Sequence, residues 1–240
     1  MNVDQTLIMR RLRRKRQKKV ASIIAGITSG ILAIIIAVAF CLRAVDRFTV
    51  TTGEEPELAL VSDSDMTRQS TTLVAPPVVG AVDTQYSEIP ETVDEGMGSK
   101  NTDYYFAYSF YLMGMGEQGT LNYNLAMSLE NQTNDIENAM RIMIIRNGGS
   151  RIVYSKADDS GAGKPIYSGD KNYPDEKKII GYTLPFRKNK YIIVETYEIA
   201  SGEFDKFTIV MWIDGWESVD SMKGGSLSAN LKFSTKSINY

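Results

Sequence analysis

Apolar and polar side chains alternate in several stretches of the second half of the chain. Residues 121–129 and 227–233 show the alternation most clearly, with large apolar side chains at every second position. This is the pattern of a strand that buries one face. Comparable stretches, most of them bounded by Gly, Asn, Asp or Pro, occur at 105–113, 139–146, 151–156, 178–184, 191–199 and 206–213. The pattern predicts a mainly β domain over 101–240, an antiparallel β-sandwich of about eight strands, similar to a jelly roll.

Two short helices are predicted between these strands. Asn134 with Glu137, and Asp214 with Glu217, have the spacing of a helix cap followed by an acidic residue. The second helix is expected to end at Gly224 and Gly225, where glycine permits a left-handed turn.

Residues 20–42 contain no charged side chain and are dominated by Ile, Ala, Val and Leu. A helix of this length, rising about 1.5 Å per residue, can cross a hydrocarbon core of roughly 30 Å. Residues 1–19 carry eight basic side chains and one acidic side chain. The positive-inside rule therefore predicts a basic cytoplasmic tail over 1–19, a membrane helix over 20–42 and an extracytoplasmic location for everything that follows.

Two features of the predicted span leave alternatives open. A cleaved signal peptide has a similar basic start and a shorter apolar region, and Ala37-Val38-Ala39 resembles its cleavage site. Lipidation at Cys41 is not expected, because Phe40 precedes it. Ser22, Gly26 and Gly30 recur at intervals of four, a spacing that lets two membrane helices pack closely.

Residues 43–100 are acidic and rich in Pro, Ser and Thr, with few aromatic side chains. This composition predicts an extended acidic stalk between the membrane and the domain. The apolar patches at 58–61 and 73–82 indicate an alternative, in which they add strands to the domain and shorten the stalk.

The composition restricts the chemistry. The chain has 240 residues, no His, one Cys and a formal net charge of −2. A Ser-His-Asp triad, a Cys-His pair, a CxxC redox pair and the usual zinc sites are all excluded. The basic run at 1–19 is interpreted as a topology signal that attracts lipid headgroups, and no nucleic acid partner is expected.

Carboxylates are the remaining candidates for site chemistry. Asp214, Glu217 and Asp220 are spaced by three, and Ca²⁺ prefers oxygen ligands, so these three residues are a weak candidate calcium site. A capping box explains this spacing without a metal and is the favoured interpretation. A glycosidase pair of carboxylates is not indicated by any spacing, so we expect no enzyme activity, no cofactor and no other metal site.

The start of the domain concentrates aromatic residues, from Tyr104 to Tyr111. They would occupy both faces of the first strand. Burial between two sheets is one explanation, and an exposed edge strand that pairs with a partner strand is the other.

Several short motifs resemble those of membrane-anchored extracytoplasmic β-sandwich proteins of Gram-positive bacteria, distantly similar to the TasA and camelysin-like proteins. They are the aromatic strand at 105–112, the segment from Trp212 to Gly215, the Gly224-Gly225 pair and the final strand around Phe233. The sequence departs from the group's pattern at 217–220, where an Asp-Pro and a Cys are usual. The resemblance covers the domain from about residue 101 and implies a jelly-roll fold and a role in matrix or fibre formation. Camelysin's protease activity is not carried over, because a zinc site without His or Cys would be exceptional.

Together these features predict a single-pass membrane protein that presents a β-sandwich outside the cell. We expect it to act as a structural or interaction module of the cell envelope, binding the lipid bilayer and either an envelope protein or a second copy of itself. The alternative is an accessory subunit of a membrane complex that docks through its membrane helix.

Overall fold

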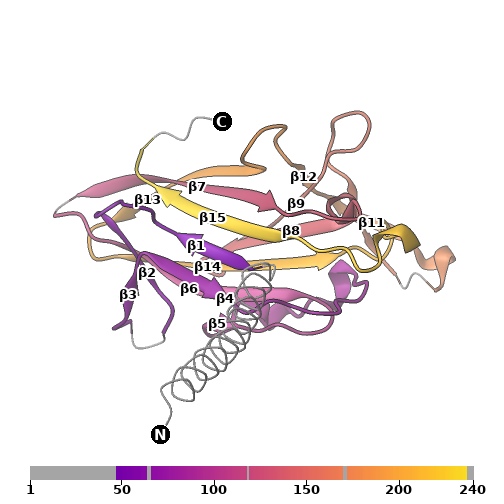
Figure 1. Ribbon diagram of the computed structural model, residues 1–240, viewed down its shortest axis with the longest axis horizontal. Coiled ribbons are helices and arrows are strands. Elements are labelled where there is room, and N and C mark those ends of the chain that lie inside the picture. The colour runs from indigo at the N-terminus through magenta and orange to yellow at the C-terminus, as the bar shows by residue number, and fades with distance from the viewer. Residues whose placement is uncertain (1–46, 64–65, 118, 170–171, 237–240) are drawn as a thin grey trace, which may run out of the picture. The chain divides into compact units, whose positions relative to one another are not determined.

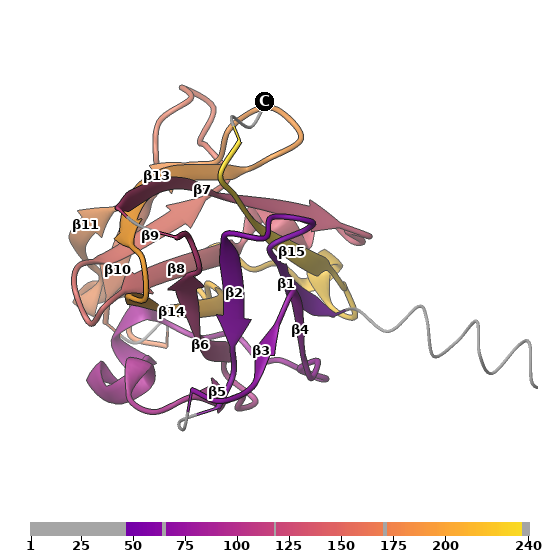
Figure 2. The ribbon, with the colours of Figure 1, turned by 90° about the vertical axis from the view of Figure 1, so that its left-hand side faces the viewer.

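The computed structural model describes residues 47–63, 66–117, 119–169 and 172–236, and the chain over these residues is mainly β. Two mixed sheets face each other (Figures 1 and 2). The smaller sheet has the order β13 (Ile193–Ala200), β7 (Thr120–Glu130), β15 (Ser228–Ser234), β1 (Phe48–Thr51) and β4 (Thr72–Ala75).

The larger sheet has the order β12, β9, β8, β14, β6, β2 and β3, and β5 pairs with β6 beside this path. The bounds of its strands are Leu184–Pro185 for β12, Arg151–Ser155 for β9, Met140–Arg146 for β8, Phe204–Ile213 for β14, Phe106–Gly114 for β6, Leu58–Val61 for β2, Gln69–Ser70 for β3 and Gly98–Ser99 for β5. A separate hairpin joins β10 (Pro165–Ser168) and β11 (Lys178–Tyr182).

The two sheets share one apolar core. Residues that point inward from the smaller sheet, such as Tyr123, Leu125 and Phe233, pack with Phe110 and Phe207 of the larger sheet. All five of these side chains are fully buried. In β7 and β15 the alternation in the sequence marks the face that the strand turns toward this core, whereas the other face of β6, β8 and β14 packs into a second buried apolar cluster.

All eight predicted strands are present, but the sheets are not purely antiparallel. Strand β1 runs parallel to β15, and β12 runs parallel to β9. Parallel neighbours need a long connection between them. For β1 and β15 that connection is almost the whole domain, a pairing that local periodicity cannot show.

The prediction of an extended stalk over 43–100 is wrong for the residues from 47 onward. Strand β1 pairs with β15 and β4, and β2 pairs with β6 and β3, so this segment belongs to both sheets. The alternative, in which the patches at 58–61 and 73–82 add strands, is the one observed for β2 and β4. Strands β2 and β4 pair with β6 and β1 respectively, and apolar side chains from both pack in the core between the two sheets.

The predicted helices shrink to 3-10 turns. The structure has five of these in the described residues: η1 (Tyr86–Glu88), η2 (Glu91–Asp94), η3 (Ile136–Asn138), η4 (Pro174–Glu176) and η5 (Asp220–Met222). Asn134 does not cap η3, which follows Asp135, and Asp214 does not cap η5, which follows Val219. No described helix is long and apolar enough to cross a membrane. The predicted tail at 1–19, the span at 20–42 and the packing residues Ser22, Gly26 and Gly30 lie outside the described residues.

Strand β6 settles the question of the aromatic residues. It is hydrogen-bonded on one side to β14 and on the other to β2 and β5, so it is not an edge strand. Tyr105, Phe106, Tyr108 and Phe110 are buried, and Tyr104, just before the strand, is exposed. The proposal of β-strand addition at this strand is therefore wrong, and burial explains the aromatic enrichment.

One buried carboxylate ties the first loop of the domain to its last strand. Glu55 accepts hydrogen bonds from Thr235 (2.8 Å) and Ser234 (3.1 Å). The hydrogen bond from Thr235 is the main reason that the pKa of Glu55 is lowered in the folded protein.

We therefore expect Glu55→Gln to flatten the pH dependence of stability in acid. A carboxylate with a lowered folded-state pKa stabilises the fold above its unfolded-state pKa, and this contribution is lost as the pH falls through the folded-state value. Urea unfolding at pH 6 and pH 3 would measure it. Glu55→Gln should lose less stability between the two values than the parent protein, with exposed Glu54→Gln as control, and an identical loss in all three proteins would contradict the assignment.

Candidate functional site: an apolar groove at one end of the sandwich

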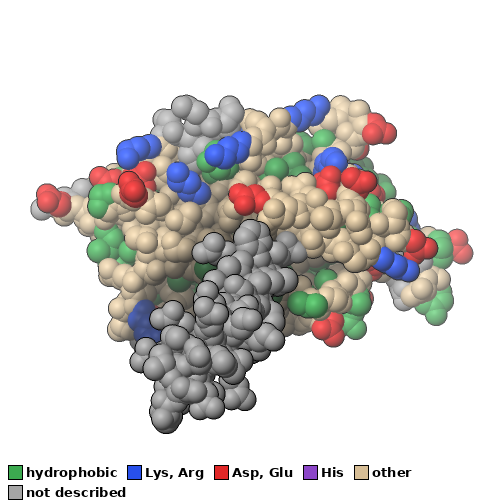
Figure 3. Space-filling model, viewed as in Figure 1, with side chains coloured by type: hydrophobic (Ala, Val, Ile, Leu, Met, Phe, Trp, Pro, Cys, Tyr) green, Lys and Arg blue, Asp and Glu red, His purple; other side chains and the backbone are tan. Residues whose placement is uncertain are grey.

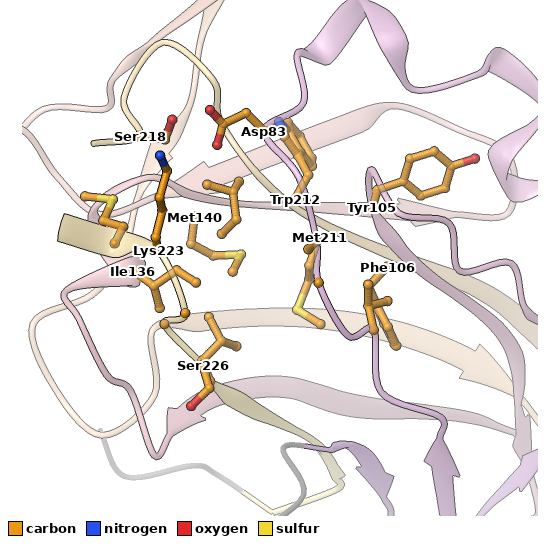
Figure 4. Close-up of a pocket in the computed structure, with 18 of the residues that line it drawn as sticks. Asp83, Tyr105, Phe106, Ile136, Met140, Met211, Trp212, Ser218, Lys223 and Ser226 are labelled. Carbon is orange, nitrogen blue, oxygen red and sulfur yellow. The ribbon is translucent and has the colours of Figure 1, made fainter. Parts of the chain in front are cut away.

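A cavity of about 440 Å³ lies at the end of the domain where β1 begins and β14 ends. We call it the groove. Its walls are the segment at 77–83, residues 104–106 at the start of β6, residues 211–213 at the end of β14 and the loop at 218–227. Figure 4 shows Met140 and Met211 pointing into the cavity. Its lining is mainly apolar and includes three methionines, which adapt readily to different partners.

Charged and polar side chains lie at the rim of the groove. Asp83, Ser218 and Lys223 gather on one side of it (Figure 4), and Arg47 lines it where the described chain begins. Lys223 forms an ion pair with Asp220 at 2.8 Å. The hydrogen bond with Asp220 raises the pKa of Lys223, and the charge of Asp83 adds to this effect. The rim therefore offers both signs of charge around an apolar interior.

The segment that forms one wall is held to the end of β14 by main-chain hydrogen bonds. Thr84 donates to the Ile213 carbonyl at 2.8 Å, and Gly215 donates back to the Thr84 carbonyl at 3.0 Å. The Thr84 hydroxyl also donates to the Tyr104 carbonyl at 2.6 Å. These bonds fix the 77–83 wall relative to the sheet although it has no regular structure.

The opposite wall, the loop at 218–227, is tied to the turn before β8. The Thr133 main-chain N–H donates to the Ser226 carbonyl at 3.0 Å, and the Ser226 N–H donates to the Thr133 hydroxyl at 2.8 Å. The Asn134 side chain donates to the Lys223 carbonyl at 2.9 Å. Gly224 has a φ of 72°, in the left-handed region that glycine adopts without strain. The Gly224-Gly225 pair thus shapes a wall of the groove.

Gly225 is required by close packing. A Cβ at this position would lie 2.8 Å from the Met222 carbonyl oxygen and 3.0 Å from that of Thr133. We expect Gly225→Ala to cost about 1–3 kcal/mol, because backbone atoms must move to accept the methyl group. Gly116→Ala is the matched control, since its Cβ would meet nothing within 4 Å. Thermal and urea unfolding of both variants test this, and equal stability would show that the loop yields without cost.

Asp214, which directly follows the last residue of β14, forms a buried ion pair. Its carboxylate is 2.9 Å from the Arg141 guanidinium, and the two side chains are 8% and 1% exposed. The other carboxylate oxygen accepts a hydrogen bond from the Trp216 main chain at 2.9 Å. Burial raises the pKa of Asp214, and the charge of Arg141 opposes that rise.

The candidate calcium ligands do not form a site. Each carboxylate has a cationic partner of its own: Asp214 pairs with Arg141, Glu217 with Lys164 at 2.7 Å, and Asp220 with Lys223. Within the described ranges, no group of three or more His, Cys, Asp or Glu side chains is placed to hold a metal ion. In the structure these three residues therefore belong to three separate ion pairs.

Of the motif residues, Trp212, Gly224 and Gly225 line the groove, whereas Gly215 and Phe233 do not. Trp212 is buried, lines the groove and packs against Tyr86 with the ring centroids 6.4 Å apart. Gly215 makes the bond to Thr84 described above, and Phe233 is in the core. Sequence reasoning did not identify Met140, Met211 or the 77–83 wall as parts of a site. The apolar patch at 73–82 inside an otherwise polar stretch was the available signal.

Comparison of the sequence with known proteins does not assign it to a family. No protein-family model matches the sequence, and no curated protein matches it.

The charge on one face of the molecule is mixed. On the face seen in Figure 3, acidic and basic side chains are interspersed. The apolar groove is the candidate binding surface in the described part of the chain.

Proposed function

We propose that the protein is a single-pass, membrane-anchored module of the cell envelope that binds an apolar segment of an envelope protein in its groove. The observation that carries this proposal is a cavity of about 440 Å³, mainly apolar, with rim charges of both signs. Cavities of this size and lining are typical of binding sites. The partner is a membrane protein, because the groove adjoins Arg47, only five positions after the end of the predicted span at 20–42.

The jelly-roll form of the sandwich and the extracytoplasmic location are parts of the same proposal. Two facing sheets with one core support the first, and the basic residues at 1–19 before an apolar stretch support the second. The proposal gives the chain no catalytic role.

Site-specific photo-cross-linking in cells tests the binding role. A photoreactive residue at Lys223, at the rim, should trap a membrane protein, and one at Lys188, between β12 and β13, should not. Ala81→Trp would fill the groove from an exposed wall position, and the cross-link at Lys223 should then fall at least five-fold. Ala162→Trp, on an exposed loop, is the control for adding an indole. The same neighbours from both positions, insensitive to Ala81→Trp, would overturn the proposal.

The second candidate is an accessory subunit that docks through its membrane helix. The small residues Ser22, Gly26 and Gly30 favour it, because they would allow close helix packing. Replacing residues 20–42 with an unrelated apolar helix separates the two. Under the groove proposal the cross-link at Lys223 survives the replacement, whereas under the accessory proposal it is lost.

A further inference from the structure

The folded domain begins very close to the end of the predicted membrane helix. The span is predicted to end at Leu42, and β1 begins at Phe48. The five steps from Leu42 to Arg47 reach about 18 Å at full extension. If residues 20–42 anchor the chain, as the proposed function holds and on which this inference rests, the Arg47 end of β1 lies near the bilayer surface.

Exposed apolar side chains surround this same end of the domain. Val79 is 84% exposed, Val219 55%, Tyr104 52% and Val82 44%. Val79 lies between groove-lining residues 78 and 80, Val82 lies between 81 and 83, and Tyr104 and Val219 line the groove directly. We call these four residues the rim patch. They come from three separate segments of the chain, so local sequence composition alone does not explain their grouping.

We infer that the rim patch rests on the outer surface of the lipid bilayer, with the groove opening at that surface. Valine side chains gain by leaving water, and tyrosine is favoured at the membrane interface, where its ring is buried and its hydroxyl stays hydrated. Arg47 and Lys223 lie at the groove together with Asp83 and Asp220. This balance of charge means that the contact depends on apolar insertion and does not require anionic lipid.

A second set of exposed apolar residues provides an internal comparison. Ile179, Ile180, Tyr182 and Leu184 are each about half exposed or more, and they belong to β11 and β12. None of them lines the groove. Figures 1 and 2 both show β11 well away from β1. If lipid contact depends on closeness to the predicted membrane helix, it should occur at the rim patch and not at these four residues. Both sets are apolar, so apolar character alone would not separate them.

Fluorescence quenching by lipid tests the inference in the full-length protein. Cys41 is replaced by Ser, single cysteines are placed at Val79, Val219 or Tyr182, and each is labelled with an environment-sensitive dye in phosphatidylcholine vesicles. Shallow spin-labelled lipid should quench the dyes at 79 and 219 at least two-fold and leave the dye at 182 nearly unchanged. Equal quenching at all three positions, or none, overturns the inference. A blue shift that grows with protein density and resists lipid quenching shows a second copy on the rim patch and also overturns it.

A double variant tests whether the rim-patch side chains themselves favour contact with lipid or only lie near it. In Val82→Ser/Val219→Ser, quenching of the dye at 79 should fall by about half, and unchanged quenching overturns a role for these side chains. Vesicle flotation reports the anchor independently. Protein that floats without rim quenching overturns the inference and leaves the proposed function standing, whereas protein that does not float overturns the proposed membrane anchor itself.

Discussion

Asp214→Ala is expected to lower the free energy of unfolding by about 3–5 kcal/mol, because it leaves the Arg141 guanidinium buried without its counter-ion. Arg141 is 1% exposed and its pair with Asp214 measures 2.9 Å. Burial lowers the pKa of Arg141, and the negative charge of Asp214 opposes that shift. Removing the carboxylate also removes the acceptor for the Trp216 main chain. Urea unfolding followed by circular dichroism measures the loss.

Two controls keep this prediction specific. Arg141→Met/Asp214→Leu removes both charges and should cost much less than Asp214→Ala, because no unpaired ion remains buried. Asp220→Ala removes an ion pair whose partners are 82% and 94% exposed, and it should change stability by less than about 0.5 kcal/mol. A double variant as unstable as Asp214→Ala would show that packing, and not charge pairing, dominates at this position.

Phe233→Ala is expected to be as damaging, at about 3–5 kcal/mol, because it opens a cavity where the two sheets meet. The Phe233 ring is fully buried and lies 5.1 Å from Phe207 and 5.9 Å from both Phe110 and Tyr123, measured between centroids. Aromatic pairs of this kind add to the energy of apolar burial. The same unfolding experiment measures the effect.

Phe204→Ala is the matched control for Phe233→Ala. Phe204 begins β14, is only partly buried and has one aromatic contact among the described residues, with Tyr111 at 6.0 Å. Its removal should cost less than half as much. Comparable losses for the two variants would mean that the core between the sheets does not dominate stability.

Strands such as β7 and β15 are largely predictable from sequence, because each turns one face toward the core between the sheets, whereas β6, β8 and β14 are buried on both faces. The alternation around Tyr123 and Leu125 is a direct consequence of that geometry. From residue 47 onward the structure shows the alternative of added strands, for β2 and β4, in place of the predicted stalk, and the composition favours the stalk for a physical reason. Strands such as β2 are only four residues long and pair with partners such as β6, about fifty positions away, so an apolar stretch of this length inside an acidic, Pro-rich segment is a weak signal.

The candidate site was less predictable than the fold. Spacing suggested that Asp214, Glu217 and Asp220 converge, but Arg141 and Lys164 arrive from other strands and loops and pair with two of them. The groove depends on loops whose positions are set by bonds such as that between Thr84 and Ile213. Thr84 and Ile213 are more than a hundred positions apart, and Thr133 and Ser226 are 93 positions apart, so a single sequence gives no sign of these bonds.

Only a few residues separate the predicted membrane helix at 20–42 from β1, and this short separation bears on the proposed function of the groove. A domain on a long stalk could meet partners far from the membrane, whereas under the proposed anchor a domain whose first strand begins at Phe48 would be held close to it. The proposed partner is accordingly a membrane protein, and the rim patch is proposed to meet lipid. Both proposals require the domain to lie outside the cell.

Cysteine accessibility tests that central claim most directly, because Cys41 is the only cysteine in the chain. In a Cys41→Ser background, Tyr182→Cys places one thiol at a position that is 67% exposed. A membrane-impermeant maleimide added to intact cells should label this thiol as fully as it does after the cells are permeabilised. Labelling that appears only after permeabilisation would place the domain in the cytoplasm and contradict the proposed topology.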